Sequence, residues 1–368
     1  MAMLVPMSAA CAAQWLEDLK DPDDGHLDLS EWLLDSKGFL PVPIIITEPA
    51  LGFGGGVVAT FFRESIREAS SRRQDQGRLA PPDIYFIGGG ATENGTWFGA
   101  GGGMVSFDND RFRWRGGVMR MSVNLDFYGF GGNLGPIGYN LDGWASVQHG
   151  MWRLGQSDWW AVARWNYLDL QSRFNFESQV AQLPDLVRTN KASGLGLSLE
   201  VDTRDNIFTP SRGYTGSIDA TFYDPDWGSD TSFQSYRAHA FGYWPIGKEW
   251  VIGGRIDGRT VDGRVPFFML PYVDLRGVPA ARLQDRHTAV LETELRWNMT
   301  PRWALIGFVG GGKAWGTTTS YSDGADTVAR GVGFRYLIAR RLGLYLGVDV
   351  AKSTQDHAVY LQVGSAWR

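Results

Sequence analysis

Glu292 and Glu294 are the acids whose spacing most directly suggests a pairing role. One residue separates them, and the neighbouring alternate positions are apolar: Ala289, Leu291, Leu295 and Trp297. Because alternate residues of a strand point to opposite faces, both carboxylates are expected on the inward face. Carboxylates placed in this way can accept two parallel hydrogen bonds from an arginine guanidinium, which lysine cannot copy.

Asp202 and Arg204 form a second charged pair. They continue a stretch in which Leu195, Leu197, Leu199 and Val201 alternate with small or polar residues. The alternation predicts that both charged side chains face the interior. We expect them to join an internal ion-pair network beside a turn made by Pro210 and Gly213. A direct contact with a substrate is the alternative.

The acidic residues between 21 and 31 hint at calcium. If Gly25 is aligned with the invariant glycine of an EF-hand loop, three acids fall at ligand positions 5, 9 and 12. Positions 1 and 3 would then be Lys20 and Pro22, which supply no carboxylate. We therefore predict no metal site here, and expect a solvated acidic turn or the start of a helix.

Motifs typical of catalysis are missing from the sequence. The five histidines, at 26, 149, 239, 287 and 357, are scattered, and neither His-Glu-x-x-His nor Gly-x-Ser-x-Gly occurs. A triad assembled from distant residues would leave no such motif. The single cysteine, Cys11, permits no intrachain disulfide. We predict a protein that is not an enzyme and has no cofactor.

Charge and hydropathy exclude two further classes. The chain of 368 residues has 35 Lys and Arg against 40 Asp and Glu, so it lacks the basic excess that binds nucleic acid. No run of 18 apolar residues occurs, so no transmembrane helix is predicted. The mean hydropathy of −0.21 is compatible with a soluble protein, but also with a membrane barrel, which carries its apolar residues at every second position.

Alternation of apolar and polar residues is the dominant pattern. Between 342 and 350 every second residue is leucine or valine, and the residues between them are glycine, tyrosine or aspartate. Such stretches run for 10–14 residues, long enough for a tilted strand to cross a bilayer, whereas soluble strands average about five or six. Aromatic residues cluster near the strand ends, where an interfacial girdle would place them. These features favour a closed antiparallel transmembrane β-barrel over a soluble sandwich.

Fifteen strands can be placed, the first at 51–63 and the last at 357–368. Bacterial barrels prefer an even number, so we predict about sixteen strands. The remaining strand is expected between 126 and 144, where five glycines blur the pattern. The glycine-rich first strand is expected to pair weakly with the last one. In the last strand, Trp367 is grouped with the outward Val359, Leu361 and Val363.

The N-terminal part divides into two segments. Residues 1–13 are small and apolar, as in the end of a secretory signal peptide, although its positive start is missing. Residues 14–40 are acidic and partly amphipathic, and we expect a short periplasmic leader or an inward-folded plug. The barrel is expected to occupy residues 41–368.

Four motifs, found in five stretches of the sequence, together resemble the BamA/TamA family of outer-membrane assembly barrels, also called bacterial surface antigens. They are EVDTRDNIFTPSRGY (200–214), YVDLRGVPAARLQD (272–285), LETELRW with FVGGGKAW (291–297 and 308–315), and YLQVGSAWR (360–368). The resemblance covers roughly residues 40–368. It departs from the family in three places: there is no room for periplasmic POTRA domains, Val278 stands where an aromatic is usual, and Gly310 replaces an acid.

The resemblance implies a role for several residues. Arg276 and Gly277 correspond to the signature of a long loop that folds back into the barrel. By this resemblance Arg276 pairs with wall acids, here Glu292 and Glu294, and locks the loop. An exposed loop arginine is the alternative. By the same resemblance, Gln362, Gly364 and Trp367 belong to the C-terminal assembly signal of such barrels.

The family also implies a function at the bacterial outer membrane. We expect a barrel that inserts or transports protein or lipid there, working through a lateral seam and the inward loop. The expected partners are outer-membrane lipid, the assembly machinery that inserts the barrel, and a separate periplasmic protein, with no nucleic acid. A passive pore and a structural surface antigen are the alternatives. The feature that distinguishes a passive pore is whether residues 14–38 and 263–286 fill the lumen.

Overall fold

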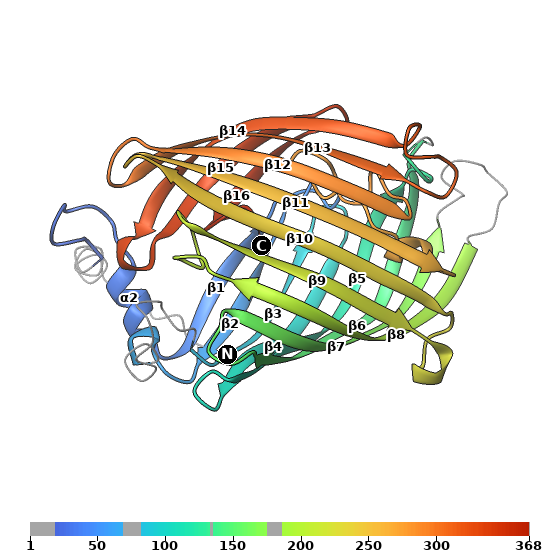
Figure 1. Ribbon diagram of the computed structural model, residues 1–368, viewed down its shortest axis with the longest axis horizontal. Coiled ribbons are helices and arrows are strands. Elements are labelled where there is room, and N and C mark those ends of the chain that lie inside the picture. Colours follow the sequence, from blue (N-terminus) through green and yellow to red (C-terminus); the bar gives the residue numbers. More distant parts are fainter. Residues whose placement is uncertain (1–18, 69–81, 133–134, 175–185, 368) are drawn as a thin grey trace.

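The computed structural model describes residues 19–68, 82–132, 135–174 and 186–367. Within them, sixteen antiparallel strands form one sheet, in which each strand pairs with its neighbour in the sequence. The sheet curls into a nearly closed barrel (Figure 1). This confirms the predicted fold class and strand number. The expected signal peptide at 1–13 lies outside the described residues.

The strands follow the chain in simple up-and-down order. The first eight are β1 (Gly38–Ile46), β2 (Gly54–Phe62), β3 (Ile84–Thr92), β4 (Trp97–Phe107), β5 (Phe112–Phe127), β6 (Ile137–Arg153), β7 (Trp159–Phe174) and β8 (Leu186–Asp202). The other eight are β9 (Gly213–Tyr223), β10 (Phe233–Ile246), β11 (Trp250–Gly263), β12 (His287–Asn298), β13 (Trp303–Trp315), β14 (Ala325–Ala339), β15 (Leu344–Ser353) and β16 (His357–Val363).

The alternation in the sequence becomes the two faces of the wall. Leu197 of β8 and Ile218 of β9 are 70% and 68% exposed on the outer face. The residues that alternate with them along each strand point inward. An exposed band of large apolar side chains is what a barrel presents to lipid. No helix among the described residues has the length and apolarity needed to cross a membrane.

The sixteenth strand does not lie where the sequence suggested. The described residues between β5 and β6, 128–132 and 135–136, form no strand. The additional strand is β1, which begins at Gly38, three residues before the expected start of the barrel. Pro41 and Pro43 hid it, because proline cannot donate to a β-ladder and argues against a strand. An edge strand tolerates both prolines, and β1 pairs along one side with β2.

The seam of the barrel therefore lies between β1 and β16, and not between 51–63 and the last strand. No ladder of backbone hydrogen bonds joins these two strands in the described part of the chain. Each edge strand is short, with nine residues in β1 and seven in β16, compared with 16 or 17 in β5 to β8.

The segment before β1 lies against one end of the barrel. It contains the short helix α2 (Ser30–Asp35), which Figure 1 shows at that end, next to the start of β1. Leu34 of α2 packs on Ala339 and Leu342, where β14 turns into β15. The described residues 19–37 therefore pack against the rim of the barrel wall. It is the loop between β11 and β12 that enters the lumen.

Candidate functional site

The loop between β11 and β12, residues 264–286, packs inside the barrel. Its apolar residues form a core with the inner wall: Val273, Leu275, Val278 and Leu283 with Val290, Ala314 and Ala329. Glycines of β13 make room for it. A Cβ on Gly310 would lie 2.7 Å from Leu275 Cδ1, and one on Gly312 would lie 2.2 Å from Val273 Cγ1. The glycine that replaces the family's acid therefore gives the loop its space.

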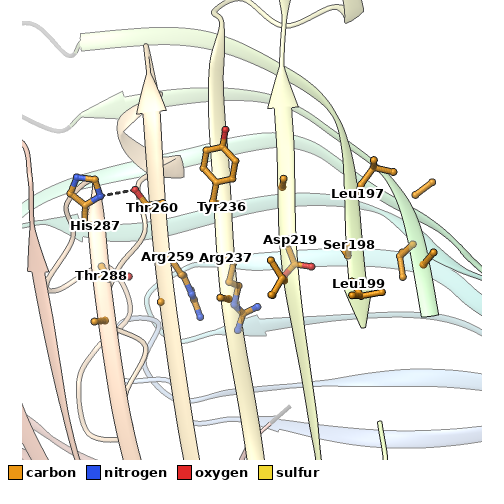
Figure 2. Close-up of a pocket in the computed structure, with 18 of the residues that line it drawn as sticks. Leu197, Ser198, Leu199, Asp219, Tyr236, Arg237, Arg259, Thr260, His287 and Thr288 are labelled. Carbon is orange, nitrogen blue, oxygen red and sulfur yellow. Dashed lines mark hydrogen bonds between the residues drawn. The ribbon is translucent and has the colours of Figure 1, made fainter. Parts of the chain in front are cut away.

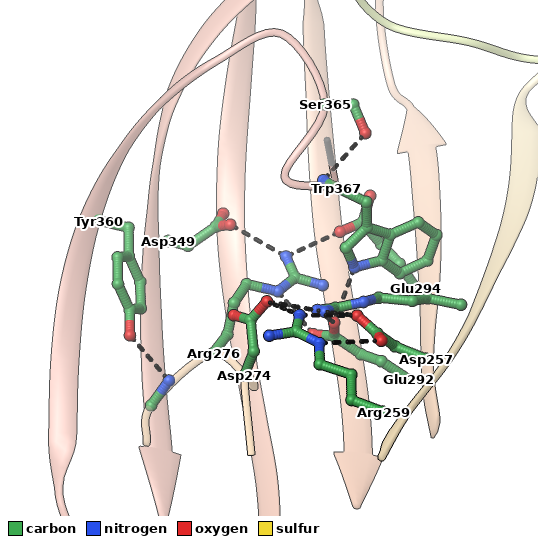
Figure 3. Close-up of polar contacts among 12 residues, drawn as sticks. Asp257, Arg259, Asp274, Arg276, Glu292, Glu294, Asp349, Tyr360, Ser365 and Trp367 are labelled. Carbon is green, nitrogen blue, oxygen red and sulfur yellow. Dashed lines mark hydrogen bonds and ion pairs between the residues drawn. The ribbon is translucent and has the colours of Figure 1, made fainter. Parts of the chain in front are cut away.

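Arg276 lies at the centre of this loop, among carboxylates of the wall (Figure 3). Its Nε donates to Glu292 Oε1 over 2.7 Å, and its Nη1 lies 2.8 Å from Glu294 Oε2. The arginine side chain is only 8% exposed and Glu292 is fully buried. The structure thus brings together the three residues that the sequence singled out. That they lock the loop stays a prediction.

Asp349 of β15 completes the site, and the sequence analysis missed it. Its Oδ2 accepts from Arg276 Nη1 over 3.1 Å, and its carboxylate also accepts two hydrogen bonds from Arg335 of β14. Asp349 supplies the acid that Gly310 does not. The sequence did contain a signal for this residue, because Asp349 is the acidic residue among the inward-facing positions of β15.

The guanidinium of Arg276 also lies flat against aromatic side chains. Its Cζ is 3.6 Å from the ring centroid of Phe308 and 5.9 Å from that of Trp367. Stacking of this kind is specific to arginine, since a lysine ammonium is a compact and strongly hydrated charge. Removing one partner of such a buried set leaves uncompensated charge, at a cost of about 3–5 kcal/mol.

The residues after Arg276 connect the two edges of the barrel. Gly277 N–H donates to the hydroxyl of Tyr360 on β16 over 2.9 Å, and Ala280 N–H donates to Glu48 Oε1 over 2.9 Å. Glu48 belongs to the turn between β1 and β2, and burial raises its pKa. Gly277 has a φ of +87°, a conformation that favours glycine. The loop thus bridges the seam that the strands leave open.

A second arginine cluster holds the loop at Asp274, two residues before Arg276. Asp274 Oδ2 accepts from Arg255 and Arg259, each over 3.0 Å, and both arginines also contact Asp257 of β11. Arg237 of β10 donates to the same Asp257 over 2.8 Å. This cluster was not predicted from the sequence, although its residues in the barrel wall occupy inward-facing positions of β10 and β11.

The C-terminal residues do not continue the outward pattern of β16. Trp367, grouped above with the outward valines and leucine, is only 3% exposed and lies inside the barrel. The strand ends at Val363, and Gly364, with a φ of +80°, turns the chain inward. A periodic pattern cannot reveal such a break in the backbone. Gln362 remains in β16 opposite Gly347, and the assembly role of these residues stays a prediction.

Asp202 and Arg204 form a pair with each other. Arg204 donates to both carboxylate oxygens of Asp202, over 2.8 and 2.7 Å. The wider lumen network is carried by Glu200, which lies 2.8 Å from Arg115 and 3.3 Å from Arg164. These residues line a lumen cavity of about 820 Å³, whose wall also includes His149 and Trp367.

The acids of the N-terminal segment form ion pairs with arginines at this end of the barrel. Asp21, Asp24 and Asp28 surround Arg302, in the turn between β12 and β13, and the arginine is 3% exposed. Arg302 lies 2.6 Å from both Asp24 and Asp28, and its hydrogen bonds lower the pKa of Asp24 to about 2. The expected acidic turn is present at residues 22–24, where Asp23 and Asp24 are exposed, and a helix follows from Ser30. The sequence could not indicate the contact with an arginine nearly 280 residues away.

The outer wall has a separate hollow of about 980 Å³ (Figure 2). Small side chains form much of its floor, and Leu197, Tyr236 and His287 are among the larger ones around them. His287 Nδ1 and Thr260 Oγ1 form a hydrogen bond of 2.6 Å there. The strand alternation directs Leu197, Tyr236 and His287 away from the lumen. Arg237 and Arg259 of the second arginine cluster also contribute to the lining.

Comparisons with known proteins agree with this architecture. The family model described as "Omp85 superfamily domain" matches residues 162–356. A solved structure of BamA from Haemophilus ducreyi lacking POTRA domains 1–3 is 11% identical, with a TM-score of 0.61, over 90% of this chain and 70% of that one. CdiB from Acinetobacter baumannii is 10% identical, with a TM-score of 0.53, over 88% of this chain and 59% of that one. No curated protein sequence matches.

Proposed function

The chain belongs to the Omp85 superfamily, and we propose that it acts at the bacterial outer membrane in the insertion or translocation of protein or lipid. The observation that carries this proposal is the loop across the seam. One short segment, Gly277–Ala280, contacts both the β16 side and the β1 side of the barrel. Its neighbour Arg276 anchors that segment to the wall through three carboxylates.

Such an arrangement suits a barrel that opens sideways. The strand edges lack a ladder of their own in the described residues, so holding them together falls to side chains and to the loop. Unpaired strand edges are templates for another strand. A client segment could pair with β1 or β16 once the loop contacts are released, and the wall opposite the seam would stay intact.

A passive pore is the competing function. The lumen cavity of about 820 Å³ and its arginines favour it. Against it stands the loop core, which packs on the inner wall and occupies part of the lumen. We therefore give the pore second place, and the structural surface antigen third, since that role needs no buried loop anchor.

The orientation follows from the order of strands. Sixteen strands place the start of β1 and the end of β16 at the same end of the barrel. Bacterial barrels of this kind turn their short connections to the periplasm and their longer loops outward. We propose that α2 lies on the periplasmic side, where a separate protein could deliver clients. Insertion of the barrel itself would use the cell's assembly machinery, and lipid surrounds its wall.

The first test is the outer-membrane composition of a deletion strain, complemented with the wild-type chain, with Arg276→Ala or with a matched Arg286→Ala control. Arg286 belongs to the same loop but donates to the carbonyl oxygen of Gly263. We expect selective loss of particular proteins or lipids, restored by the wild type and by the control and not by Arg276→Ala. An unchanged membrane, together with ion conductance of the purified protein in planar bilayers, would favour the pore.

A further inference from the structure

Two cations face lipid near the seam without a partner among the described residues. Arg330 of β14 and Lys352 of β15 are directly opposite each other in the strand register. Both are exposed, and both share the face of the outward-pointing Val332 and Val350. His357 of β16 is the next residue of the same row.

The acids nearby form no ion pair with either cation in the described part of the chain. Asp356, in the turn between β15 and β16, lies 3.4 Å from His357 Nδ1 and accepts from the His357 backbone N–H. Asp326, higher on β14, is the register partner of Lys313 on β13. The guanidinium of Arg330 and the ammonium of Lys352 therefore have no ion-pair partner in the described part of the chain.

The height of the pair identifies the kind of partner. Lys352 and His357 flank the short β15–β16 turn, at the end of the barrel opposite the chain termini. Directly below them in the strands, Val332, Val350 and Val359 are 66%, 52% and 52% exposed. Val328, two residues beyond Arg330 on the same face, is 55% exposed, so the two cations stand among apolar side chains of the outer face next to this turn. A cation on the lipid face is costly at the bilayer midplane and costs little near the headgroups.

We propose that Arg330 and Lys352 bind the phosphate of an anionic lipid in the leaflet at the loop-bearing end. Arginine can hold two phosphate oxygens with parallel hydrogen bonds, and lysine adds a point charge. The exposed valines beneath contact the acyl chains of the same molecule. The bound lipid lies on β14 and β15, next to β16 and the seam, and so defines the lipid that borders this edge. The proposal does not depend on what the barrel transports.

The test uses the full chain in nanodiscs of phosphatidylcholine mixed with phosphatidylglycerol, compared with a double variant, Arg330→Gln/Lys352→Gln. After detergent extraction, mass spectrometry gives the ratio of the two lipids retained on the protein. The wild type should enrich phosphatidylglycerol, and the variant should lose about fivefold of this enrichment for each cation removed. Arg212→Gln/Lys248→Gln, two cations in turns at the other end, is the matched control and should keep it.

Two results would overturn the proposal. One is equal enrichment in the wild type and in the Arg330→Gln/Lys352→Gln variant. The other is loss of the enrichment when inorganic phosphate is added at low concentration, which would indicate a free-anion site and not a lipid site. Circular dichroism and heat-dependent gel mobility establish that each variant is folded, and Lys352→Arg, which preserves the charge, should retain the lipid.

Discussion

Trp367 donates its indole N–H to Oε2 of Glu292 over 2.7 Å, at the same carboxylate whose other oxygen accepts from Arg276 (Figure 3). One buried acid on β12 therefore holds both the inward loop and the C-terminal residues of the chain. The C-terminal residues that follow β16 and the inward loop therefore meet at one carboxylate.

The loop anchor should depend on the guanidinium and not on charge alone. Arg276→Ala leaves Glu292, Glu294 and Asp349 facing one another without their cation, which should lower the free energy of unfolding by about 3–5 kcal/mol. Arg276→Lys should be intermediate, because it keeps a charge but loses the fork and the stacking on Phe308.

Unfolding in denaturant and limited proteolysis of residues 264–286 measure this effect. Arg286→Ala, in the same loop, is the control and should behave as the wild type. Unchanged protease resistance in Arg276→Ala would show that the apolar core of the loop suffices to hold it.

The C-terminal contact should be separable into a hydrogen bond and a packing contribution. Trp367→Phe keeps an aromatic ring next to Phe241 and Tyr243 but removes the N–H donated to Glu292, at an expected cost of about 1–3 kcal/mol. Trp367→Ala should cost about 3–5 kcal/mol, because it also leaves a cavity.

Thermal unfolding of the two variants tests this prediction. Trp303→Phe, on the exposed outer wall, is the matched control. Equal stability of Trp367→Phe and the wild type would mean that the bond to Glu292 contributes nothing.

The N-terminal segment should detach in acid. Arg302 holds the pKa of Asp24 at about 2 in the folded protein, below its ordinary value of 3.8, and the pKa of Asp28 is lowered as well. A depressed folded-state pKa stabilises the contact above the ordinary pKa, and this stabilisation is lost as the pH falls towards 2.

Hydrogen exchange of residues 21–29 at several pH values reports the detachment. Exchange should be slow at pH 7 and fast below about pH 3, while β5 to β8 stay protected. In Arg302→Gln the segment should already exchange fast at pH 7. Slow exchange in that variant would contradict a role for the arginine.

The contact between Glu48 and the loop should respond to pH in the opposite direction. Burial raises the pKa of Glu48, so its charged form is the unfavourable one in the folded protein. The contribution is fully present below the ordinary pKa of 4.5 and is lost as the pH rises through the raised value.

Glu48→Gln should therefore protect the backbone N–H of Ala280 more than the wild type does at pH 8, and equally at pH 4. The glutamine keeps a side-chain oxygen for this N–H without carrying the buried charge. Glu93→Gln, a change to an exposed acid near the same turn, is the control. Weaker protection in Glu48→Gln at pH 8 would show that the carboxylate charge is needed.

Local pattern was enough to predict the wall of this barrel. Alternation over 10 or more residues identified most strands and assigned Glu292 and Glu294 to the inward face, because the two faces of a strand are fixed by its own backbone. The resemblance of short motifs then singled out Arg276. β1 was missed for a local reason as well, since Pro41 and Pro43 are rare in strands that pair on both sides.

Contacts between distant parts of the chain were decided by the tertiary structure. Nothing local indicates that Asp349 meets Arg276 across 73 residues, or that Arg302 gathers acids from the N-terminal segment. Trp367 fits an outward pattern until Gly364 changes the direction of the backbone. The sequence by itself determined which side chains face inward. Closure of the sheet decided which of them meet, because burial inside the barrel makes an unpaired charge costly and selects the partners within reach.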